Sequence, residues 1–371
     1  MKILEITEFS AGICGVWTRV LAESREFVKL GHEVHVFSSD AIQGTDKKAA
    51  ADEIIDGIRI RRFASTHNPL TKNVNNFDFK QVLIYLTPDI VITHLIHPHS
   101  FEALRICREQ NTPCYLVTHA PFNVKRRFPL NLATKFYYNF KVKPAMNFFT
   151  RIIAITKWEL PYLYALGVEH EKISYIPNGL PDEFFKQIPK ENISVGKDVL
   201  FLGRISQVKN IKCLLEAAKC LPQVEFSVVG SQDEEYVKSL NIPDNVNVYP
   251  PIYDLKKKIE LIDDHKIFVL PSIREAMPQA LLEALSRGRL VISSDTDGGK
   301  ELINDMENGF LFKIGDSEHL AALIKDNMRT EPHLDYMFKT FKENAVNSAR
   351  PYAWKELIKS YLLLFENDKK N

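Results

Sequence analysis

The sequence lacks three features that would each point to a particular class of protein. Its five cysteines are odd in number and include no Cys-x-x-Cys pair, which argues against a disulfide framework and a zinc site. No apolar run approaches the roughly 20 residues of a membrane-spanning helix. The 48 Lys and Arg nearly balance the 47 Asp and Glu, and a net charge of +1 excludes a globally basic nucleic-acid-binding protein. We therefore expect no nucleic-acid partner.

The start of the chain and its length indicate a cytoplasmic protein with two domains. "MKILEIT" has a strand-like pattern in place of the charged-then-apolar pattern of a secretory leader. Scattered cysteines suit a reducing compartment. Of the 371 residues, 45% are hydrophobic and 26% are charged, as in an ordinary globular protein, and this length favours two domains.

Short β-branched runs alternate with helical patterns along the chain, as in "KILEIT", "EVHVFSS", "DIVITHL" and later "VLFLG", "EFSVVG" and "KIFVLPS". Strands that alternate with helices predict βαβ units and parallel sheets. The alternation stops in a Pro- and Gly-rich stretch between Tyr175 and Asp198 and then resumes. We therefore predict an α/β protein with an N-terminal domain of residues 1–176 and a C-terminal domain of residues 177–350.

The segment "VLFLGRISQVKNIKCLLEAA" is the first candidate site. Apolar residues recur at helical spacing after Asn210, so we predict a helix that begins near this residue. Arg204 follows the strand and Lys209 lies at the helix start, where a cation is unfavourable unless an anion lies close by. Two cations and free amides at such a turn favour a diphosphate site without a metal. The alternative is that both side chains are solvated loop residues.

The segment "KIFVLPSIREAMPQALLEALSRG" is the second candidate site. It places Glu275 after a buried strand and Glu283 about two turns into a helix, with Pro278 in the first turn. Ligands of doubly wound sheets bind at the carboxyl ends of strands, where one carboxylate can bind sugar hydroxyls and the other ribose hydroxyls. Amides near the helix start would face phosphate; they are those of Met277, Gln279 and Ala280. The alternative is an acid favoured before a helix and a second acid on a solvated face.

Together these segments resemble the family 4 retaining glycosyltransferases of the GT-B fold. "GRISQVKN" is similar to the family's phosphate segment, "EAMPQALLE" to its paired-glutamate motif, "DTDGGKELI" with "ENGFLF" to the loop that follows, and "IPNG" to the entry to its second domain. "YAWKELIKSYLLLF" is similar to the last helix, which crosses back to the N-terminal domain, so residues 351–371 are assigned there. The resemblance implies two Rossmann-like domains that face each other across a cleft.

The resemblance also implies a set of site residues. His119 and Glu275 match the catalytic positions, where the histidine contacts the donor sugar without acting as a general base. Gly15 is the survivor of the adjacent glycines that the family has after its first strand, and Cys14 replaces the other. The positions implied in donor binding are Gly15, Gly203, Arg204, Lys209, Tyr253, Ala276, Met277, Pro278, Gln279 and Glu283. Ala276 stands where the family has glycine, and we expect it to narrow the donor-sugar pocket.

Two further polar features can be judged by the same resemblance. Asp295 and Asp297 look like a metal-binding pair, but they coincide with a family loop where no metal is expected. We therefore predict no metal and no cofactor. His94 also ends a predicted strand, and it is a weaker candidate for the site than His119.

The resemblance implies a metal-independent, retaining transfer of a hexosyl group from a nucleoside-diphosphate sugar to a glycan or lipid-linked acceptor. One alternative is a Rossmann-type oxidoreductase or epimerase, which would require a Gly-x-Gly-x-x-Gly fingerprint that the chain lacks. Another is a catalytically impaired nucleotide-sugar-binding subunit of a membrane-associated glycan assembly system, which the Cys14 and Ala276 departures keep open.

An acid-free stretch between Gln110 and Trp158 combines basic and aromatic residues. Its cations are Lys125, Arg126, Arg127, Lys135, Lys141, Lys143, Arg151 and Lys157. A functional interpretation is a surface that meets an anionic membrane and a lipid-linked acceptor, which would make the protein peripheral on the cytoplasmic face. The alternative is a buried aromatic core with a solvated rim of cations.

Overall fold

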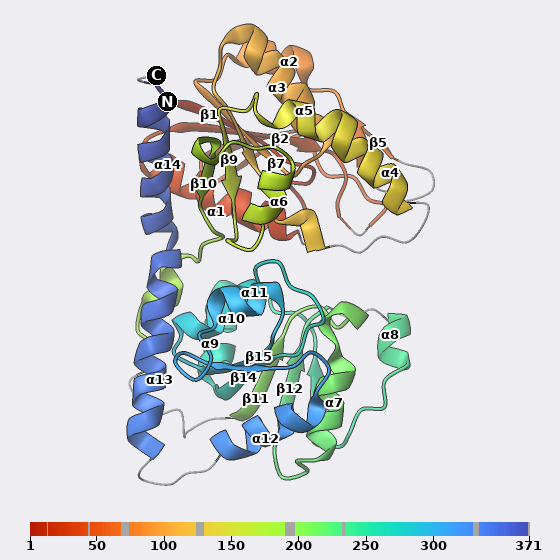
Figure 1. Ribbon diagram of the computed structural model, residues 1–371, viewed down its shortest axis with the longest axis vertical. Coiled ribbons are helices and arrows are strands. Elements are labelled where there is room, and N and C mark those ends of the chain that lie inside the picture. The colour runs from red at the N-terminus through yellow and green to blue at the C-terminus, as the bar shows by residue number, and fades with distance from the viewer. Residues whose placement is uncertain are drawn as a thin grey trace. The chain divides into compact units, whose positions relative to one another are not determined.

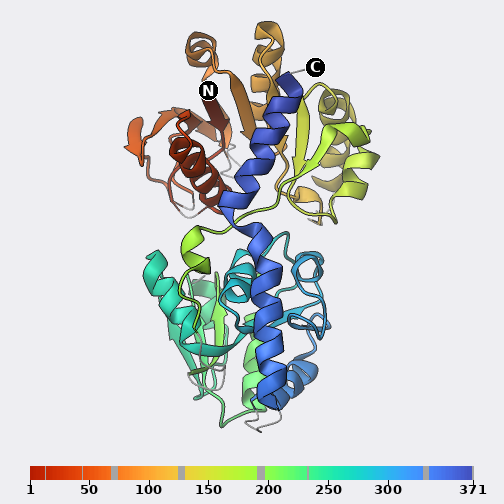
Figure 2. The ribbon, with the colours of Figure 1, turned by 90° about the vertical axis from the view of Figure 1, so that its left-hand side faces the viewer.

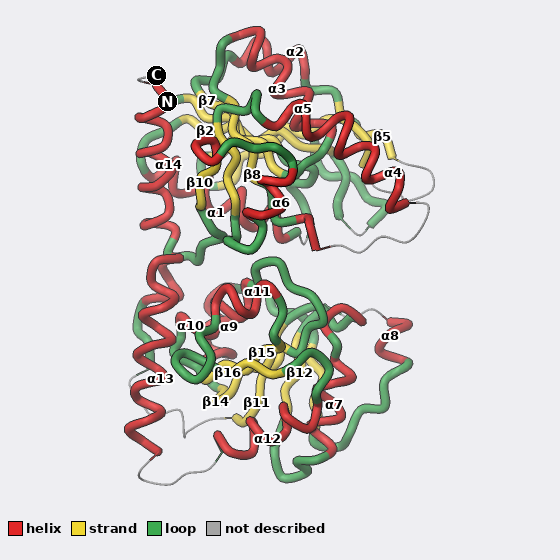
Figure 3. The backbone as a smooth tube through the Cα atoms, viewed as in Figure 1, coloured by secondary structure: helices red, strands yellow, loops and turns green. Residues whose placement is uncertain are grey.

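A computed structural model describes residues 1–12, 14–43, 45–67, 74–123, 130–189, 197–231, 234–328 and 334–369. The chain forms two compact units, one of Met1–Gly179 with Trp354–Asn371 and one of Leu180–Ala353 (Figure 1). The contact boundary thus follows Gly179, whereas the sequence analysis put it after residue 176. In each unit the strands gather into one main sheet and helices lie against it (Figure 3), so the predicted α/β class is confirmed.

Unit 1 contains an eight-stranded sheet in the order β10-β9-β8-β7-β1-β2-β4-β3. All neighbouring pairs are parallel except β3 with β4. Its strands are β1 (Lys2–Ile6), β2 (Glu33–Ser39), β3 (Asp52–Ile55), β4 (Ile58–Phe63), β7 (Ile90–His94), β8 (Cys114–Val117), β9 (Arg151–Ala154) and β10 (Ile173–Tyr175), with β5 (Ser65–His67) and β6 (Val74–Phe77) paired separately. The chain leaves β1 for β2 on one side and returns to β7 on the other, which makes the end of β1 a topological switch point.

The helices of unit 1 are α1 (Gly15–Lys29), α2 (Lys80–Leu86), α3 (Pro98–Gln110), α4 (Leu130–Tyr137), α5 (Lys143–Met146), α6 (Leu160–Ala165) and α14 (Trp354–Lys369). The C-terminal helix α14 lies beside α1 although more than 300 residues separate them in sequence (Figure 2). Phe27 of α1 packs against the rings of Tyr361 and Phe365 on α14, with centroids 5.6 and 6.0 Å away. Aromatic burial therefore fixes α14 to unit 1.

Unit 2 contains a six-stranded, all-parallel sheet in the order β13-β12-β11-β14-β15-β16. Numbered within the unit, this is the 3-2-1-4-5-6 order of dinucleotide-binding folds, with a switch point between β11 and β14. Its strands are β11 (Lys197–Leu202), β12 (Phe226–Val229), β13 (Val246–Tyr249), β14 (His265–Leu270), β15 (Leu290–Ser294) and β16 (Phe310–Phe312). Its helices are α7 (Ile211–Lys219), α8 (Glu234–Lys238), α9 (Leu255–Asp263), α10 (Gln279–Ser286), α11 (Asp297–Leu302), α12 (Ser317–Asn327) and α13 (Leu334–Ala349).

The predicted helix starts in unit 2 are partly confirmed. Asn210 directly precedes α7 and has a left-handed backbone, with φ of 51°. Pro278 lies at the N-cap just before α10, so its placement in the first helical turn was wrong. Glu283 is the fifth residue of α10, which puts it little more than one turn into the helix and not two. Among the described residues, no helix combines the length and the apolar character that spanning a bilayer requires.

Candidate active site

The switch point of unit 2 brings both sequence-predicted motifs together. Gly203 and Arg204 follow β11, and the segment from Ser272 to Glu275 follows β14, the neighbouring strand. Because the chain continues to opposite sides of the sheet after these two strands, their carboxyl ends form the switch point at which sheets of this kind bind ligands. The sequence predicted two sites 66 residues apart, and the fold makes them neighbours.

Lys209 and Glu275 form the ion pair at the centre of this region. Nζ of Lys209 lies 2.5 Å from Oε1 of Glu275, and the Ser272 hydroxyl donates to the same oxygen at 2.5 Å. The side chains of Lys209 and Glu275 are 24% and 10% exposed, so an arriving ligand can reach the pair. A polyanion bound beside Lys209 would interact with the same ammonium group as Glu275. The Glu275 carboxylate, already held by two donors, is well oriented to accept hydrogen bonds from sugar hydroxyls.

Glycines allow three backbone segments to approach closely around this pair. A Cβ on Gly230, at the end of β12, would lie 1.7 Å from the carbonyl oxygen of Gly203. A Cβ on Gly298 would lie 2.5 Å from the carbonyl oxygen of Ala276, and the Gly298 amide donates to the Glu275 carbonyl at 3.2 Å. The Gly298 contacts therefore hold the backbone at Glu275 and Ala276, and the Gly230 contact holds the turn after β11; neither approach leaves space for a side chain on the glycine.

Glu283 is paired inside unit 2. Its side chain is 10% exposed, and its Oε1 accepts a hydrogen bond of 2.9 Å from Nζ of Lys258 on α9. Burial raises the pKa of the Glu283 carboxyl, and the charge of Lys258 opposes that rise. The alternative that Glu283 occupies a solvated helix face is therefore wrong.

The remaining residues that are predicted to bind the donor differ in how far they are exposed to solvent. Met277 and Pro278 are buried and support the loop before α10. Nε2 of Gln279 is buried and has no hydrogen-bond partner in the part of the chain that the structure describes. Arg204 is exposed and forms no ion pair with a described residue, and the ring of Tyr253, just before α9, is 65% exposed. The exposed guanidinium of Arg204 is available to a ligand, whereas the unsatisfied side-chain nitrogen of Gln279 has no exposed surface.

Of the two aspartates that resemble a metal-binding pair, Asp295 and Asp297, the first has a structural function. Oδ1 of Asp295 accepts a hydrogen bond from the backbone amide of Ile314, and Asp297 is the exposed first residue of α11. Thr296, between them, caps the helix by accepting from the Gly299 amide.

The predicted residues of unit 1 lie after β8 and at the start of α1. His119 is half-buried, and it and Ala120 both have positive φ, of 58° and 48°. Two consecutive non-glycine residues in the left-handed backbone conformation cost free energy and are typical of functional turns. Gly15 opens α1, and a Cβ there would meet no described atom within 4 Å. Packing within unit 1 therefore does not require a glycine at this position.

Nε2 of His119 lies 3.0 Å from Nδ1 of His94, the last residue of β7. Burial and the neighbouring imidazole hold the pKa of His119 well below its ordinary value, so the ring is neutral. His94 also contacts two buried glutamates, Glu5 and Glu23, and Glu23 pairs with Arg19. The sequence analysis did not predict this cluster. A glutamate inside the apolar run "KILEI" was the available signal.

Two family models match this chain. The model described as Glycosyltransferase Family 4 matches residues 13–184, and the model described as Glycosyl transferases group 1 matches residues 183–345. The two matches overlap at residues 183–184, just after unit 2 begins, and together cover most of both units. The chain belongs to the family 4 glycosyltransferases of the GT-B type.

Known proteins agree with this assignment. The chain is similar to alpha-galactosylglucosyldiacylglycerol synthase of Streptococcus pneumoniae, at 26% identity over 59% of this chain and 62% of that protein. It is also similar to UDP-Gal:alpha-D-GlcNAc-diphosphoundecaprenol alpha-1,3-galactosyltransferase of Escherichia coli, at 29% identity over 68% of this chain and 70% of that protein. The match thus spans about six-tenths of the streptococcal relative.

Among solved structures, Anabaena HepE in complex with UDP superposes with a TM-score of 0.76. Its identity is 18%, and the superposition covers 99% of this chain and 100% of that chain. At this identity the similarity concerns the fold alone, which is GT-B with two Rossmann-like domains.

Proposed function

We propose that the protein is a metal-independent, retaining glycosyltransferase that moves a hexosyl group from a nucleoside-diphosphate sugar to a glycan or lipid-linked acceptor. The observation that carries the proposal is the Lys209–Glu275 pair at the switch point of unit 2. A cation for the diphosphate and an oriented carboxylate for sugar hydroxyls occur side by side there. The two relatives described above are named as a synthase of alpha-galactosylglucosyldiacylglycerol and as a galactosyltransferase that uses UDP-Gal and alpha-D-GlcNAc-diphosphoundecaprenol.

The residues of unit 2 would bind and activate the donor. Arg204 and Lys209 would hold the diphosphate and stabilise the negative charge that develops as it leaves. Glu275 would orient the sugar, and Glu283 would bind the ribose hydroxyls, which requires Lys258 to share the carboxylate. Gln279, the first residue of α10, would turn its backbone amide to a phosphate oxygen, next to the amide of Met277.

The transfer itself needs no protein nucleophile in this proposal. The acceptor hydroxyl oxygen bonds to the anomeric carbon on the face from which the diphosphate leaves, so configuration is retained. The bond between that carbon and the diphosphate oxygen breaks, and this oxygen accepts the proton of the acceptor hydroxyl. His119, in unit 1, would contact the donor sugar, and Gly15 would leave space for backbone contact with the donor.

The acceptor is proposed to be bound to a membrane. Phe136 and Phe140 are 55% and 69% exposed and stack at 5.7 Å between ring centroids. Lys135 and Lys141 are exposed next to them in the sequence. Aromatic rings at headgroup depth and cations above them favour binding to an anionic bilayer. The protein would then be cytoplasmic and peripheral.

A panel of UDP-, GDP- and ADP-sugars tests the proposal by thermal shift and product analysis. A donor at about 100 times its dissociation constant should stabilise the protein by about 2.7 kcal/mol. Transfer should survive EDTA, and the product should keep the anomeric configuration of the donor. An activity that EDTA abolishes and a divalent ion restores would refute metal independence. Donor binding without transfer to any lipid-linked or glycan acceptor would favour the impaired-subunit alternative.

A further inference from the structure

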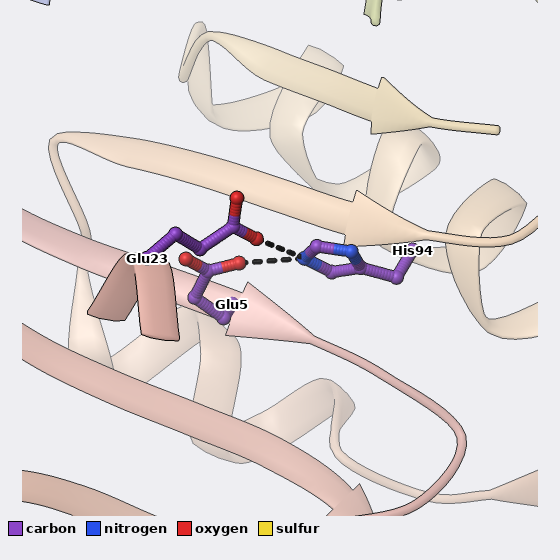
Figure 4. Close-up of side chains that lie close together, drawn as sticks. All are labelled: Glu5, Glu23 and His94. Carbon is purple, nitrogen blue, oxygen red and sulfur yellow. Dashed lines mark hydrogen bonds and ion pairs between the residues drawn. The ribbon is translucent and has the colours of Figure 1, made fainter. Parts of the chain in front are cut away.

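The buried cluster of unit 1 is defined by Glu5 on β1, Glu23 on α1 and His94 at the end of β7. All three side chains have zero exposed surface. Figure 4 shows both carboxylates approaching the same ring nitrogen, Nε2 of His94, from which Oε2 of Glu5 lies 2.6 Å and Oε1 of Glu23 lies 3.4 Å. The cluster lies at the switch point of the unit 1 sheet, where β1 pairs with β7.

Arg19 balances one of the two carboxylates. Its Nε donates to Oε2 of Glu23 at 3.2 Å, and its other nitrogens bond to Asn178, the carbonyl of Ile176 and the hydroxyl of Tyr361. The Tyr361 hydroxyl also donates to Glu23, at 2.9 Å. One cation beside two buried carboxyls leaves one negative charge uncompensated if both are ionised, which is costly in an apolar environment.

A shared proton resolves this imbalance. Oε1 of Glu5 and Oε1 of Glu23 are buried without a hydrogen-bond partner among the described residues, an arrangement that suits a neutral carboxyl better than an ionised one. Burial raises the pKa of Glu5 to about 8 and that of Glu23 to about 7, and it lowers the pKa of His94 to about 4. At neutral pH the proton therefore stays on the carboxyl pair, and His94 is neutral.

The position of this proton determines the hydrogen bonds of both histidines. A neutral imidazole has one donor and one acceptor nitrogen. When Glu5 is protonated it donates to Nε2 of His94, so Nδ1–H of His94 donates to Nε2 of His119. His119 then carries its proton on Nδ1, a nitrogen that has no hydrogen bond to the described residues. When Glu5 is ionised, every bond in this chain reverses, and Nδ1 of His119 becomes an acceptor.

We propose that Glu5 and His94 are positioning residues that fix the tautomer of His119, so that its Nδ1 presents an N–H donor to an oxygen of the bound substrate. This inference rests on the proposed transferase function and deepens it. Among the described residues, the other charged groups that act on His94 are Glu23 and Arg19, Tyr361 contacts both of these, and His99 contacts the His94 carbonyl oxygen at 2.8 Å. Arg19 and the Tyr361 hydroxyl both stabilise the ionised form of Glu23, so the shared proton is held on Glu5.

A divalent cation is the competing interpretation of the same three residues. Their ligand atoms lie within 4.8 Å of one another. The guanidinium of Arg19, however, already contacts Glu23, and a second positive charge in a region without exposed surface would be repelled. The direct contact of 2.6 Å between Glu5 and His94 is a hydrogen bond, so the proton chain is favoured.

Nitrogen NMR of protein labelled with ¹⁵N-histidine tests the inference without relying on activity. His119 of the parent at pH 7 should be the Nδ1–H tautomer. It should keep that tautomer in Glu5→Gln, whose amide can donate to His94 as the protonated acid does, and should become a mixture of tautomers in His94→Leu. His170→Gln, at an exposed position in the same unit, is the matched control and assigns one signal. An unchanged His119 spectrum in a folded His94→Leu protein overturns the inference.

Kinetics supply the second measurement. His94→Leu should lower kcat about tenfold, the effect of one positioned hydrogen bond, with little change in donor KM. The parent should lose kcat as pH rises through about 8, and Glu5→Gln should remove this loss. Full activity in His94→Leu overturns the inference. If His94→Leu changes the tautomer of His119 but the parent shows no transferase activity, only the proposed function is overturned. A shift of the His94 signal on addition of Zn²⁺ or Mn²⁺ would favour the cation site and contradict the proton chain.

Discussion

The two units concentrate charged side chains at the switch points of similar parallel sheets, but they differ in how those charges meet solvent. In unit 2, Lys209 and Glu275 remain partly exposed and directly oppose each other. In unit 1, Glu5, Glu23 and His94 are sealed from solvent, and among the described carboxylates Arg19 pairs with Glu23 alone. An exposed ion pair can exchange partners with a ligand, whereas a sealed cluster can act only through a neighbour such as His119. The proposals therefore assign direct ligand binding to unit 2 and indirect positioning to unit 1.

Removing the compensating cation of unit 1 should have the largest effect. Arg19→Met leaves Glu23 and Tyr361 without their charged partner, and breaking a buried pair costs about 3–5 kcal/mol of unfolding free energy. Arg25→Met, on the same helix, removes an exposed ion pair with Asp56 and should change stability by less than about 1 kcal/mol. Urea unfolding measures both, and equal losses would show that the cluster is not the reason for the difference.

The cations of unit 2 should matter for binding and not for stability. Arg204→Ala and Lys209→Ala should each weaken donor binding by on the order of 2–5 kcal/mol, because a phosphate charge loses its partner. Lys219→Ala, which removes an exposed pair with Glu216 on α7, is the matched control. Calorimetric titration with the donor decides, and parent-like affinity in both variants would put the diphosphate elsewhere.

The two glutamates of unit 2 should separate in their effects. Glu275→Gln should lower turnover and leave free UDP or GDP binding little changed, because this carboxylate is proposed to bind the sugar. Glu283→Gln should weaken even the free nucleotide, and it should also cost roughly 1–3 kcal/mol of stability because Lys258 loses its buried partner. The opposite kinetic pattern would reverse the two assignments.

The sealed carboxyl of unit 1 should make stability depend on pH. The pKa of Glu5 is raised from 4.5 to about 8 by folding, so its contribution to stability is present below pH 4.5 and is lost as the pH rises toward 8. Glu5→Gln should therefore raise Tm relative to the parent more at pH 8 than at pH 5. A constant difference in Tm across this range would mean that Glu5 does not hold its proton in the folded protein.

The smallest effects concern the aromatic surface of unit 1. Each cation near a bilayer surface contributes about 1 kcal/mol, so changing Lys135 and Lys141 together to Ser should weaken sedimentation with anionic vesicles, and salt should weaken it further. Phe136→Ser with Phe140→Ser should have a similar effect. Lys125, Arg126 and Arg127, which the sequence analysis assigned to the same surface, lie outside the described residues. A parent protein that ignores anionic vesicles at low salt would favour a soluble acceptor.

The sequence by itself determined the α/β class, the parallel sheets and the segments that carry Lys209, Glu275 and His119, because hydrophobic periodicity and motif spacing are local properties. It did not determine which charged groups meet. The helix position of Glu283 gave no sign of its burial against Lys258, since that pairing depends on how α9 packs beside α10. Glu5, Glu23, Arg19 and Tyr361 come from β1, α1 and α14, and only the packing of these elements brings them to His94. Burial sets the cost of a charge, and burial is decided by the tertiary structure.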